Sequence, residues 1–367
     1  MRRRFLRELD WTIILVSLVL CAAGLLMIYS ARRAQDDGLF FVRKQAIAMG
    51  IGVVAMFLVA SIPVQTWQRW TAWLYTANIV LLVYVDFFGR TTKGAQRWIP
   101  LPGGFNLQPS ELAKIFIILT LAHWLSSREE KIRSPSLVVR SLLYIGVPVL
   151  LIFKQPDLGT ALVVMAIWFG VMLLGGARLK HLGVVPIVGL LAFTAMWHLN
   201  VLEDYQKNRL VAFLDPQRDP LGSGYHILQA RIAVGSGQVF GKGLFHGTQN
   251  LLLFIPEQHT DFIFTVVAEE TGFAGSVGLL FGYGVLLWRL SALILRAHRL
   301  YTRLIAGGIT TFFAYHIIVN IGMVIGILPV VGVWLPFISF GGTAVVTCFV
   351  ALGLMQAIHR QQYEVMF

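Results

Sequence analysis

Ionisable side chains occur in this chain where a strongly apolar sequence would not be expected to tolerate them. Residues 258–261 read Gln-His-Thr-Asp and lead into an apolar stretch that carries Glu269 and Glu270. A carboxylate beside hydrocarbon is costly unless it is paired, hydrogen-bonded or functional. Asp261, close to His259, is therefore a candidate general base. The alternative interpretation is that Asp261 only caps the helix that follows.

Four more charged residues stand beside or inside apolar stretches. Glu111 and Lys114 are three residues apart, so a helix places them on one face, either as a local ion pair or as part of a site. Asp157 precedes another apolar stretch, where a plain N-cap is the simplest interpretation. Arg97 is followed by Trp98, an aromatic residue of the kind found at membrane interfaces.

Composition sets the environment for these residues. Of the 367 residues, 57% are hydrophobic and 13% are charged, whereas soluble domains carry about 25% charged residues. The mean hydropathy is +0.72. These values predict an all-α integral membrane protein, since a backbone in lipid must be hydrogen-bonded within helices or a closed barrel and the apolar runs do not alternate.

The elements that must position the charged residues are ten transmembrane helices, each about 20 residues long. We expect them near 11–30, 45–62, 68–88, 109–126, 137–153, 158–175, 182–199, 262–288, 304–327 and 340–358. The segment 109–126 is the least apolar of the ten. The chain then forms a single polytopic domain over 1–367, with a large extracytoplasmic loop at about 200–260 between helices 7 and 8.

Charge predicts the orientation of the bundle. The segments on the side of the N-terminus carry most of the cations, so both termini should be cytoplasmic. These cations are Arg2, Arg3, Arg4, Arg7, Arg69, Arg128, Lys131, Arg133, Arg140, Arg178, Lys180, Arg289, Arg296, Arg299, Arg303 and Arg360. The short outer loops keep Arg32, Arg33, Arg43, Lys44, Arg90, Lys93, Arg97 and Lys154. An outward-facing site for a polyanion would need such residues.

The connection at 200–260 is rich in glycine, and its second glycine cluster contains Lys242. Such a loop can cradle a phosphate, although a flexible turn is the plainer interpretation. Residues 227–234 have helical apolar spacing and predict a short interfacial helix. The only cysteines, Cys21 and Cys348, lie in apolar spans and supply neither a disulfide framework nor a thiolate metal site.

Several motifs occur in a characteristic order along the chain. They are GAQRWI at 94–99, QPSELAK at 108–114, QPDLGT at 155–160, GKG at 241–243, PEQHTDFIF at 256–264, NIGM at 320–323 and LPFISFGG at 335–342. Their order resembles that of the SEDS family (shape, elongation, division and sporulation) over essentially the whole chain. Within it, the short tails and the first and third motifs are most similar to the RodA branch.

The resemblance implies a ten-helix peptidoglycan glycosyltransferase that polymerises lipid II at the outer face of the bacterial cytoplasmic membrane, for cell elongation and rod shape. The family's essential aspartate falls on Asp261. We assign substrate binding to Arg97, Glu111, Lys114, Asp157, Lys242 and His259. Pyrophosphate chemistry and the family imply a divalent cation, Mg²⁺ or Mn²⁺, although the sequence shows no ligand cluster for it.

The resemblance also implies partners. These are a class B penicillin-binding protein with transpeptidase activity, the elongation machinery, undecaprenyl-linked glycan and membrane lipids, with no nucleic acid. We expect the transpeptidase to dock along the eighth and ninth spans, with Gly307, Gly308, Gly322 and Gly326 at the contact. Two other classes of function stay open from the residues: a lipid II flippase that uses the intramembrane charges as a path, and a scaffold in which Asp261 has no chemical role.

Overall fold

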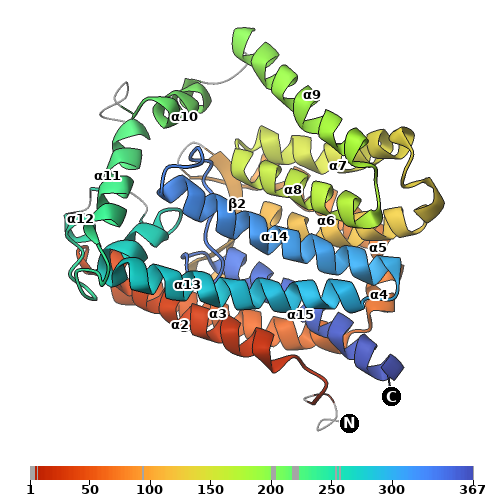
Figure 1. Ribbon diagram of the computed structural model, residues 1–367, viewed down its shortest axis with the longest axis horizontal. Coiled ribbons are helices and arrows are strands. Elements are labelled where there is room, and N and C mark those ends of the chain that lie inside the picture. Colours follow the sequence, from red (N-terminus) through yellow and green to blue (C-terminus); the bar gives the residue numbers. More distant parts are fainter. Residues whose placement is uncertain are drawn as a thin grey trace.

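The protein is a bundle of long helices (Figure 1). The structure, a computed structural model, describes residues 5, 7–92, 95–199, 204–216, 223–252, 254–255 and 258–366. The long helices are α2 (Trp11–Arg33), α3 (Gly38–Ser61), α5 (Thr71–Phe88), α6 (Pro109–Ser126), α7 (Pro135–Lys154), α8 (Leu158–Gly175), α9 (Leu179–His198), α13 (Ile263–Arg296), α14 (Leu300–Val324) and α15 (Gly342–Met366). These correspond to the ten predicted spans.

Nine of these helices are long and apolar enough to cross a membrane, counted over the described residues. The tenth is α6, which the sequence already marks as the least apolar because it carries Glu111 and Lys114. It is enclosed by its neighbours, and most of its residues are buried, both charged ones included. The predicted all-helical, multi-pass membrane fold is confirmed.

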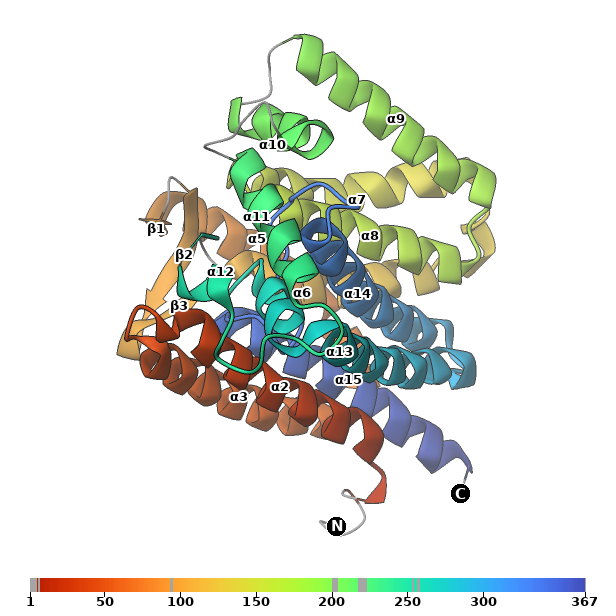
Figure 2. The same ribbon diagram turned by 60° about the vertical axis from the view of Figure 1, so that its left-hand side comes forward.

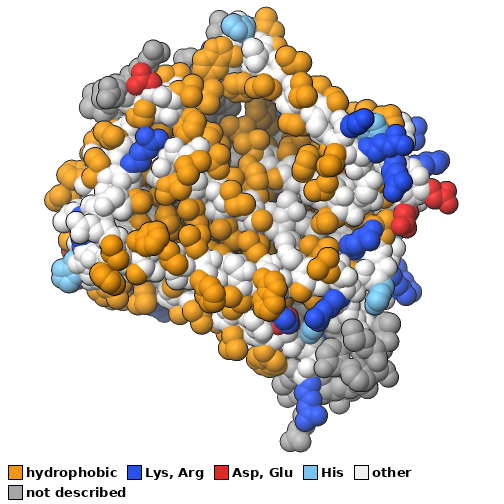
Figure 3. Space-filling view, viewed as in Figure 1, with side chains coloured by type: hydrophobic (Ala, Val, Ile, Leu, Met, Phe, Trp, Pro, Cys, Tyr) orange, Lys and Arg blue, Asp and Glu red, His pale blue; other side chains and the backbone are white. Residues whose placement is uncertain are grey.

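The helices alternate in direction, so α2 begins and α15 ends at the same end of the bundle (Figure 1). Hydrophobic side chains cover most of the face seen in Figure 3, and lysine and arginine side chains gather toward that end. Helix α9 differs from the other long helices, because almost none of its residues are buried and most of its length lies apart from the bundle (Figure 1).

A small antiparallel sheet at the opposite end was not predicted. Its strands are β1 (Arg90–Thr92), β2 (Ala95–Leu101) and β3 (Phe105–Leu107), in the order β1-β2-β3. Figure 2 shows this sheet beside the ends of α2 and α3. Gly103 and Gly104, in the turn between β2 and β3, have φ values of 76° and 74°, which glycine adopts without strain. The hairpin brings Arg97 and Phe105 to the site described below.

The connection between α9 and α13 folds at the same end. Its helices are α10 (Asp204–Leu214), α11 (Ser223–Ser236) and α12 (Thr248–Leu251), and α11 confirms the helix predicted at 227–234. The connecting helix α4 (Val64–Arg69) lies at the other end, as does the 3-10 turn at Glu129–Lys131 between α6 and α7, whereas the 3-10 turn at Pro102–Gly104 belongs to the β2–β3 hairpin.

Helix α13 is broken near its start. Gly272 has φ 66° and ψ −161°, and the 238–239 loop accepts hydrogen bonds from the amides just beyond the break: Phe273 N donates to Gln238 O at 2.8 Å and Ala274 N to Val239 O at 2.9 Å. The loop therefore replaces the hydrogen-bond partners that the helix loses at the break.

Candidate active site

A cavity of about 610 Å³ lies among helix starts, the β2–β3 hairpin and the loops before α13 and α15. Five predicted site residues line it: Arg97, Glu111, Asp157, His259 and Asp261. They come from four separate parts of the chain, since His259 and Asp261 share one segment. The cavity therefore supports a shared site at the end of the bundle away from the start of α2.

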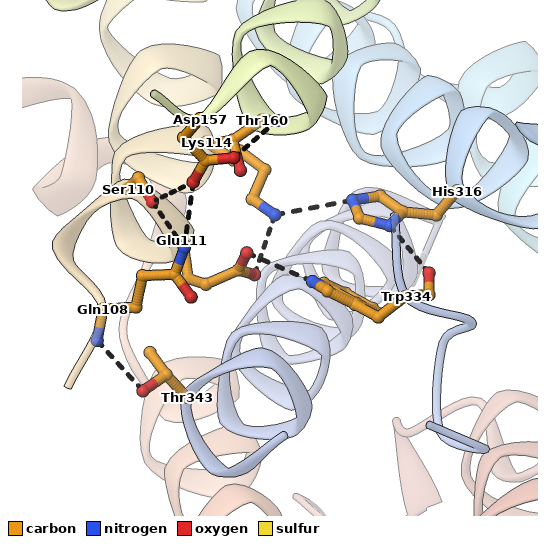
Figure 4. Close-up of polar contacts among 9 residues, drawn as sticks. All are labelled: Gln108, Ser110, Glu111, Lys114, Asp157, Thr160, His316, Trp334 and Thr343. Carbon is orange, nitrogen blue, oxygen red and sulfur yellow. Dashed lines mark hydrogen bonds and ion pairs between the residues drawn. The ribbon is translucent and has the colours of Figure 1, made fainter. Parts of the chain in front are cut away.

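The wall of the cavity contains a buried polar network (Figure 4). Lys114 Nζ lies 2.7 Å from Glu111 Oε2 and 3.4 Å from His316 Nε2. Trp334 Nε1 donates to Glu111 Oε1 at 3.1 Å, and His316 Nδ1 lies 3.1 Å from Trp334 O. Lys114 is 0% exposed. Its ammonium thus neutralises and fixes Glu111 from behind the wall.

Asp157 holds two segments together. Its Oδ1 accepts from Thr160 N at 3.2 Å, so the predicted cap of α8 is present. Its Oδ2 accepts from Gln108 Nε2 at 3.0 Å and from Ser110 Oγ at 3.3 Å. Asp157 therefore joins the start of α6 to the start of α8 as well as capping a helix.

Arg97 is largely engaged by the protein. Its Nε donates to Gln155 O at 2.7 Å and its Nη2 to Pro156 O, while Nη1 lies 3.8 Å from Asp157 Oδ1. Two backbone carbonyls and one carboxylate thus share this guanidinium. Arg97 fastens the sheet to the turn between α7 and α8 at the rim of the cavity.

The backbone around Asp261 is fixed by hydrogen bonds to three successive carbonyls, which we call the carbonyl clamp. Phe340 N donates to His259 O at 2.8 Å, and Ser339 Oγ donates to Thr260 O at 2.6 Å. Asn320 Nδ2 donates to Asp261 O at 2.8 Å and to Val333 O at 2.6 Å. These bonds tie the segment to α14 and to the loop before α15.

The position of Asp261 argues against a simple cap. Helix α13 begins at Ile263 with Phe262 as its N-cap residue, so Asp261 lies one residue before the cap position. Its carboxylate faces the glycine turn at Gly332, where a Cβ would lie 3.4 Å from Asp261 Oδ2. Gly332 also lines the cavity.

Lys242 is not among the described residues that line the cavity. Its Nζ lies 2.7 Å from both Glu269 Oε1 and Thr248 Oγ1. Of the three cations assigned to substrate binding, Arg97 lines the cavity, whereas Lys114 lies behind its wall and Lys242 lies elsewhere. Lys242 is held away from the cavity by Glu269, a carboxylate inside the next helix.

Glu269 and Glu270 bind the 242–249 loop. Glu269 Oε1 also accepts from Gln249 N at 3.0 Å, and Glu270 Oε2 accepts from Phe245 N at 3.0 Å. Glu270 also contacts another long helix, because Ser30 Oγ on α2 donates to Glu270 Oε1.

The described residues contain no group of three or more His, Cys, Asp or Glu that could hold a metal ion. Both oxygens of Glu111 and both oxygens of Asp157 already accept hydrogen bonds from protein donors. These two carboxylates are therefore a poor fit to a preformed Mg²⁺ site, which needs free oxygen ligands.

Three residues of the site were not predicted: His316, Trp334 and Lys44. His316 lies in the middle of an apolar span, which was a usable signal because histidine is rare there. Trp334 gave none beyond its type. Lys44 was noted only as one of the outer-loop cations that a polyanion site would need, and only the folded chain brings both residues to the cavity. Asn320 belongs to a motif singled out above, but its part in the carbonyl clamp was not foreseen.

Comparison with known proteins gives a consistent result. Residues 10–364 match the family described as cell cycle proteins, comprising FtsW, RodA and SpoVE. The peptidoglycan glycosyltransferase MrdB of Escherichia coli is 42% identical over 357 residues, covering 97% of this chain and 94% of MrdB. Stage V sporulation protein E of Bacillus subtilis is 36% identical, covering 96% of this chain and 97% of that protein.

Solved structures agree. One chain from a peptidoglycan synthase complex that coordinates polymerization and crosslinking superposes with a TM-score of 0.82 at 34% identity, covering 97% of this chain and 99% of that one. The rod shape determining protein RodA of Thermus thermophilus gives a TM-score of 0.69 at 30% identity, covering 97% and 98%. The chain belongs to the FtsW, RodA and SpoVE family, which is the SEDS family, and is a RodA-like peptidoglycan glycosyltransferase of the membrane.

Proposed function

We propose that the cavity polymerises lipid II, with Asp261 as the general base. The observation that carries the proposal is the placement of Asp261 on a cavity of about 610 Å³, on a backbone fixed by the carbonyl clamp. A volume of this size is within the range of small-molecule sites, about 300–1,000 Å³. A fixed backbone keeps the carboxylate at one position, which a proton transfer requires.

The reaction then follows from the residues. The acceptor sugar hydroxyl attacks the anomeric carbon of the donor and gives its proton to the Asp261 carboxylate. A C–O bond forms at that carbon, and its bond to the diphosphate oxygen breaks with the electron pair leaving on undecaprenyl diphosphate. A single displacement converts an α-linked donor into a β-1,4 glycan.

The other predicted site residues divide into two roles. Glu111, Lys114 and Asp157 hold the wall, and Arg97 holds the rim, where its charge also favours an anionic substrate. His259 lines the cavity beside Asp261 and is placed to contact a sugar. Lys242 holds the loop above α13. A divalent cation, Mg²⁺ or Mn²⁺, stays a prediction, and no step of this reaction is derived through it.

The test is polymerisation of fluorescent lipid II by the purified full-length chain. Asp261→Asn keeps the shape but cannot take a proton, so we expect a loss of about 100-fold or more. Asp86→Asn is the matched control, because Asp86 lies near the same end of the bundle, close to Lys154, and outside the cavity lining among described residues. An Asp261→Asn protein that keeps more than a tenth of the activity would exclude the general base.

The same experiment addresses the flippase alternative. A transporter needs a path through the bilayer midplane, whereas the polar residues described here gather at one end of the bundle. A scaffold would make no glycan at all. Polymerisation that depends on Asp261 supports the enzyme over both.

We further propose that the cavity opens to the outer side of the bacterial cytoplasmic membrane, with both termini inside. The concentration of lysine and arginine at the opposite end supports this orientation. The lipid-linked substrate is then met at the surface where the cell wall is built.

A class B penicillin-binding protein that crosslinks the glycan, as part of the elongation machinery, is the proposed partner. The glycines expected at the contact do not suit it: a Cβ on Gly307 would lie 2.1 Å from Leu174 Cδ1, and one on Gly308 2.9 Å from Ile118 Cγ2, so both face the protein's own bundle. Of the eighth and ninth spans, α13 carries more of the exposed large hydrophobic side chains, including Phe273 and Phe281. We therefore assign the contact to the eighth span, α13, rather than to the ninth.

A further inference from the structure

Lys44 is a charged residue that lines the cavity but has no role in the reaction proposed above. It lies on α3 and lines the cavity together with Gly104 and Phe105 of the hairpin. Its side chain is partly exposed. A lysine at this place is close enough to the cavity to meet an anion without a change of fold.

The surroundings of Lys44 hold its ammonium without neutralising it. Lys44 Nζ lies 5.1 Å from the centre of the Phe40 ring and 5.9 Å from that of Phe105. Aromatic faces attract a cation but carry no net charge. Within the described part of the chain, no hydrogen bond or ion pair to Lys44 is present.

The other cations near the cavity differ from Lys44 in this respect. Lys114 is paired with Glu111, and Arg97 is bound to two carbonyls and lies near Asp157. Lys242 is paired with Glu269. Lys44 therefore supplies positive charge that no protein group offsets.

A neighbouring helix start adds to this potential. Gln45, next to Lys44, accepts from Gly341 N at 3.0 Å and donates to Ser339 O at 3.2 Å. This pair of bonds fixes α3 against the start of α15 at Gly342, which lines the same cavity. The first amides of a helix lack intrahelical acceptors and favour an anion. Lys44 and the α15 start thus act on the same region.

We propose that Lys44 binds the diphosphate group of the lipid-linked substrate and stays with it as it leaves. This inference rests on the proposed function, because it deepens the same site. A diphosphate suits the position better than a peptide carboxylate, since it carries more charge and several acceptor oxygens for one ammonium and the helix amides. As the C–O bond breaks, negative charge grows on the diphosphate, and Lys44 stabilises it.

The test measures binding separately from polymerisation. Farnesyl diphosphate is titrated into the purified full-length chain in detergent, and binding is followed by the rise in thermal unfolding temperature. We expect Lys44→Met to weaken binding about 10- to 100-fold, the scale of one hydrogen bond to a charged group. Lys44→Arg keeps the charge and should recover most of the affinity. Lys154→Met is the matched control, a lysine at the same end that is 69% exposed and lies 3.7 Å from Asp86.

The outcomes are separable. Lys44→Met protein that binds farnesyl diphosphate as tightly as the wild type overturns the inference, as does an arginine variant as weak as the methionine variant. Asp261→Asn protein should still bind farnesyl diphosphate. If the wild type makes no glycan but its diphosphate binding depends on Lys44, the proposed function fails and the binding site stands.

Discussion

Asn320 offers a direct test of whether the carbonyl clamp serves catalysis. Its amide is completely buried and donates at 2.8 Å to Asp261 O and at 2.6 Å to Val333 O. Asn320→Ala removes both donors. Leaving the buried Val333 carbonyl without a donor costs about 1–3 kcal/mol and losing the partly exposed bond to Asp261 about 1 kcal/mol, so the free energy of unfolding should fall by about 2–4 kcal/mol.

The effect on rate should exceed what this loss of stability explains. Freed from Asn320, the Asp261 backbone can shift, and a displacement of about 1 Å can cost about 100-fold in rate. We expect kcat for lipid II polymerisation to fall by about that factor at a temperature where the variant is still folded, with KM little changed. Thermal unfolding in detergent measures the folded fraction in the same samples.

The matched control for Asn320→Ala is Asn78→Ala. Asn78 is also a buried asparagine, but its Nδ2 has no hydrogen-bond partner within the described chain, and it does not line the cavity. Its removal should leave kcat unchanged. If Asn320→Ala is destabilised yet polymerises at the wild-type rate, the clamp is structural only and the reasoning about Asp261 is refuted.

Two further predictions concern α13. Gly272→Ala should lower the free energy of unfolding by about 2–5 kcal/mol, because φ at Gly272 is 66° and the new Cβ would lie 2.3 Å from Gly241 N. The control is Gly278→Ala, where no atom lies within 4 Å of the new Cβ. Equal melting temperatures for the two variants would contradict this account of the break in α13. Gly278→Leu should reduce co-purification of the chain with the class B penicillin-binding protein proposed as its partner, whereas Gly183→Leu on α9, also in open space, should not. An undiminished yield for Gly278→Leu would place the contact away from this face of α13.

The helices could be predicted from the sequence because each apolar run is long enough to span a membrane. Every expected span has a helix in the structure, and even the weak segment at 109–126 corresponds to α6. The sheet at 90–107 could not be predicted in this way. Its strands are three to seven residues long, and apolar periodicity over so few residues does not separate a strand from a loop.

Some residues of the site could likewise be predicted from the sequence and others could not. Asp261, Glu111 and Asp157 were found because carboxylates are conspicuous among apolar residues. Lys242 was grouped with them on its charge and its glycine-rich loop, and only the fold shows that Glu269 holds it elsewhere. Lys44 could not be singled out from the sequence either. What distinguishes it is the lack of an ion-pair or hydrogen-bond partner among the described residues, and such pairing cannot be predicted from sequence.

The break at Gly272 also sets the depth of the site in the bilayer. The part of α13 from Phe273 to Arg296 is about 36 Å long at 1.5 Å per residue, already enough to cross a hydrocarbon layer of about 30 Å. The residues before the break then lie at the level of the lipid headgroups, as the bond from Ser30 near the end of α2 to Glu270 also indicates. If the cavity takes the proposed lipid-linked substrate, its sugars and diphosphate enter at the level of the headgroups while the polyprenyl chain stays in the hydrocarbon layer. Binding then requires neither transfer of the polar groups into the hydrocarbon nor removal of the polyprenyl chain from it.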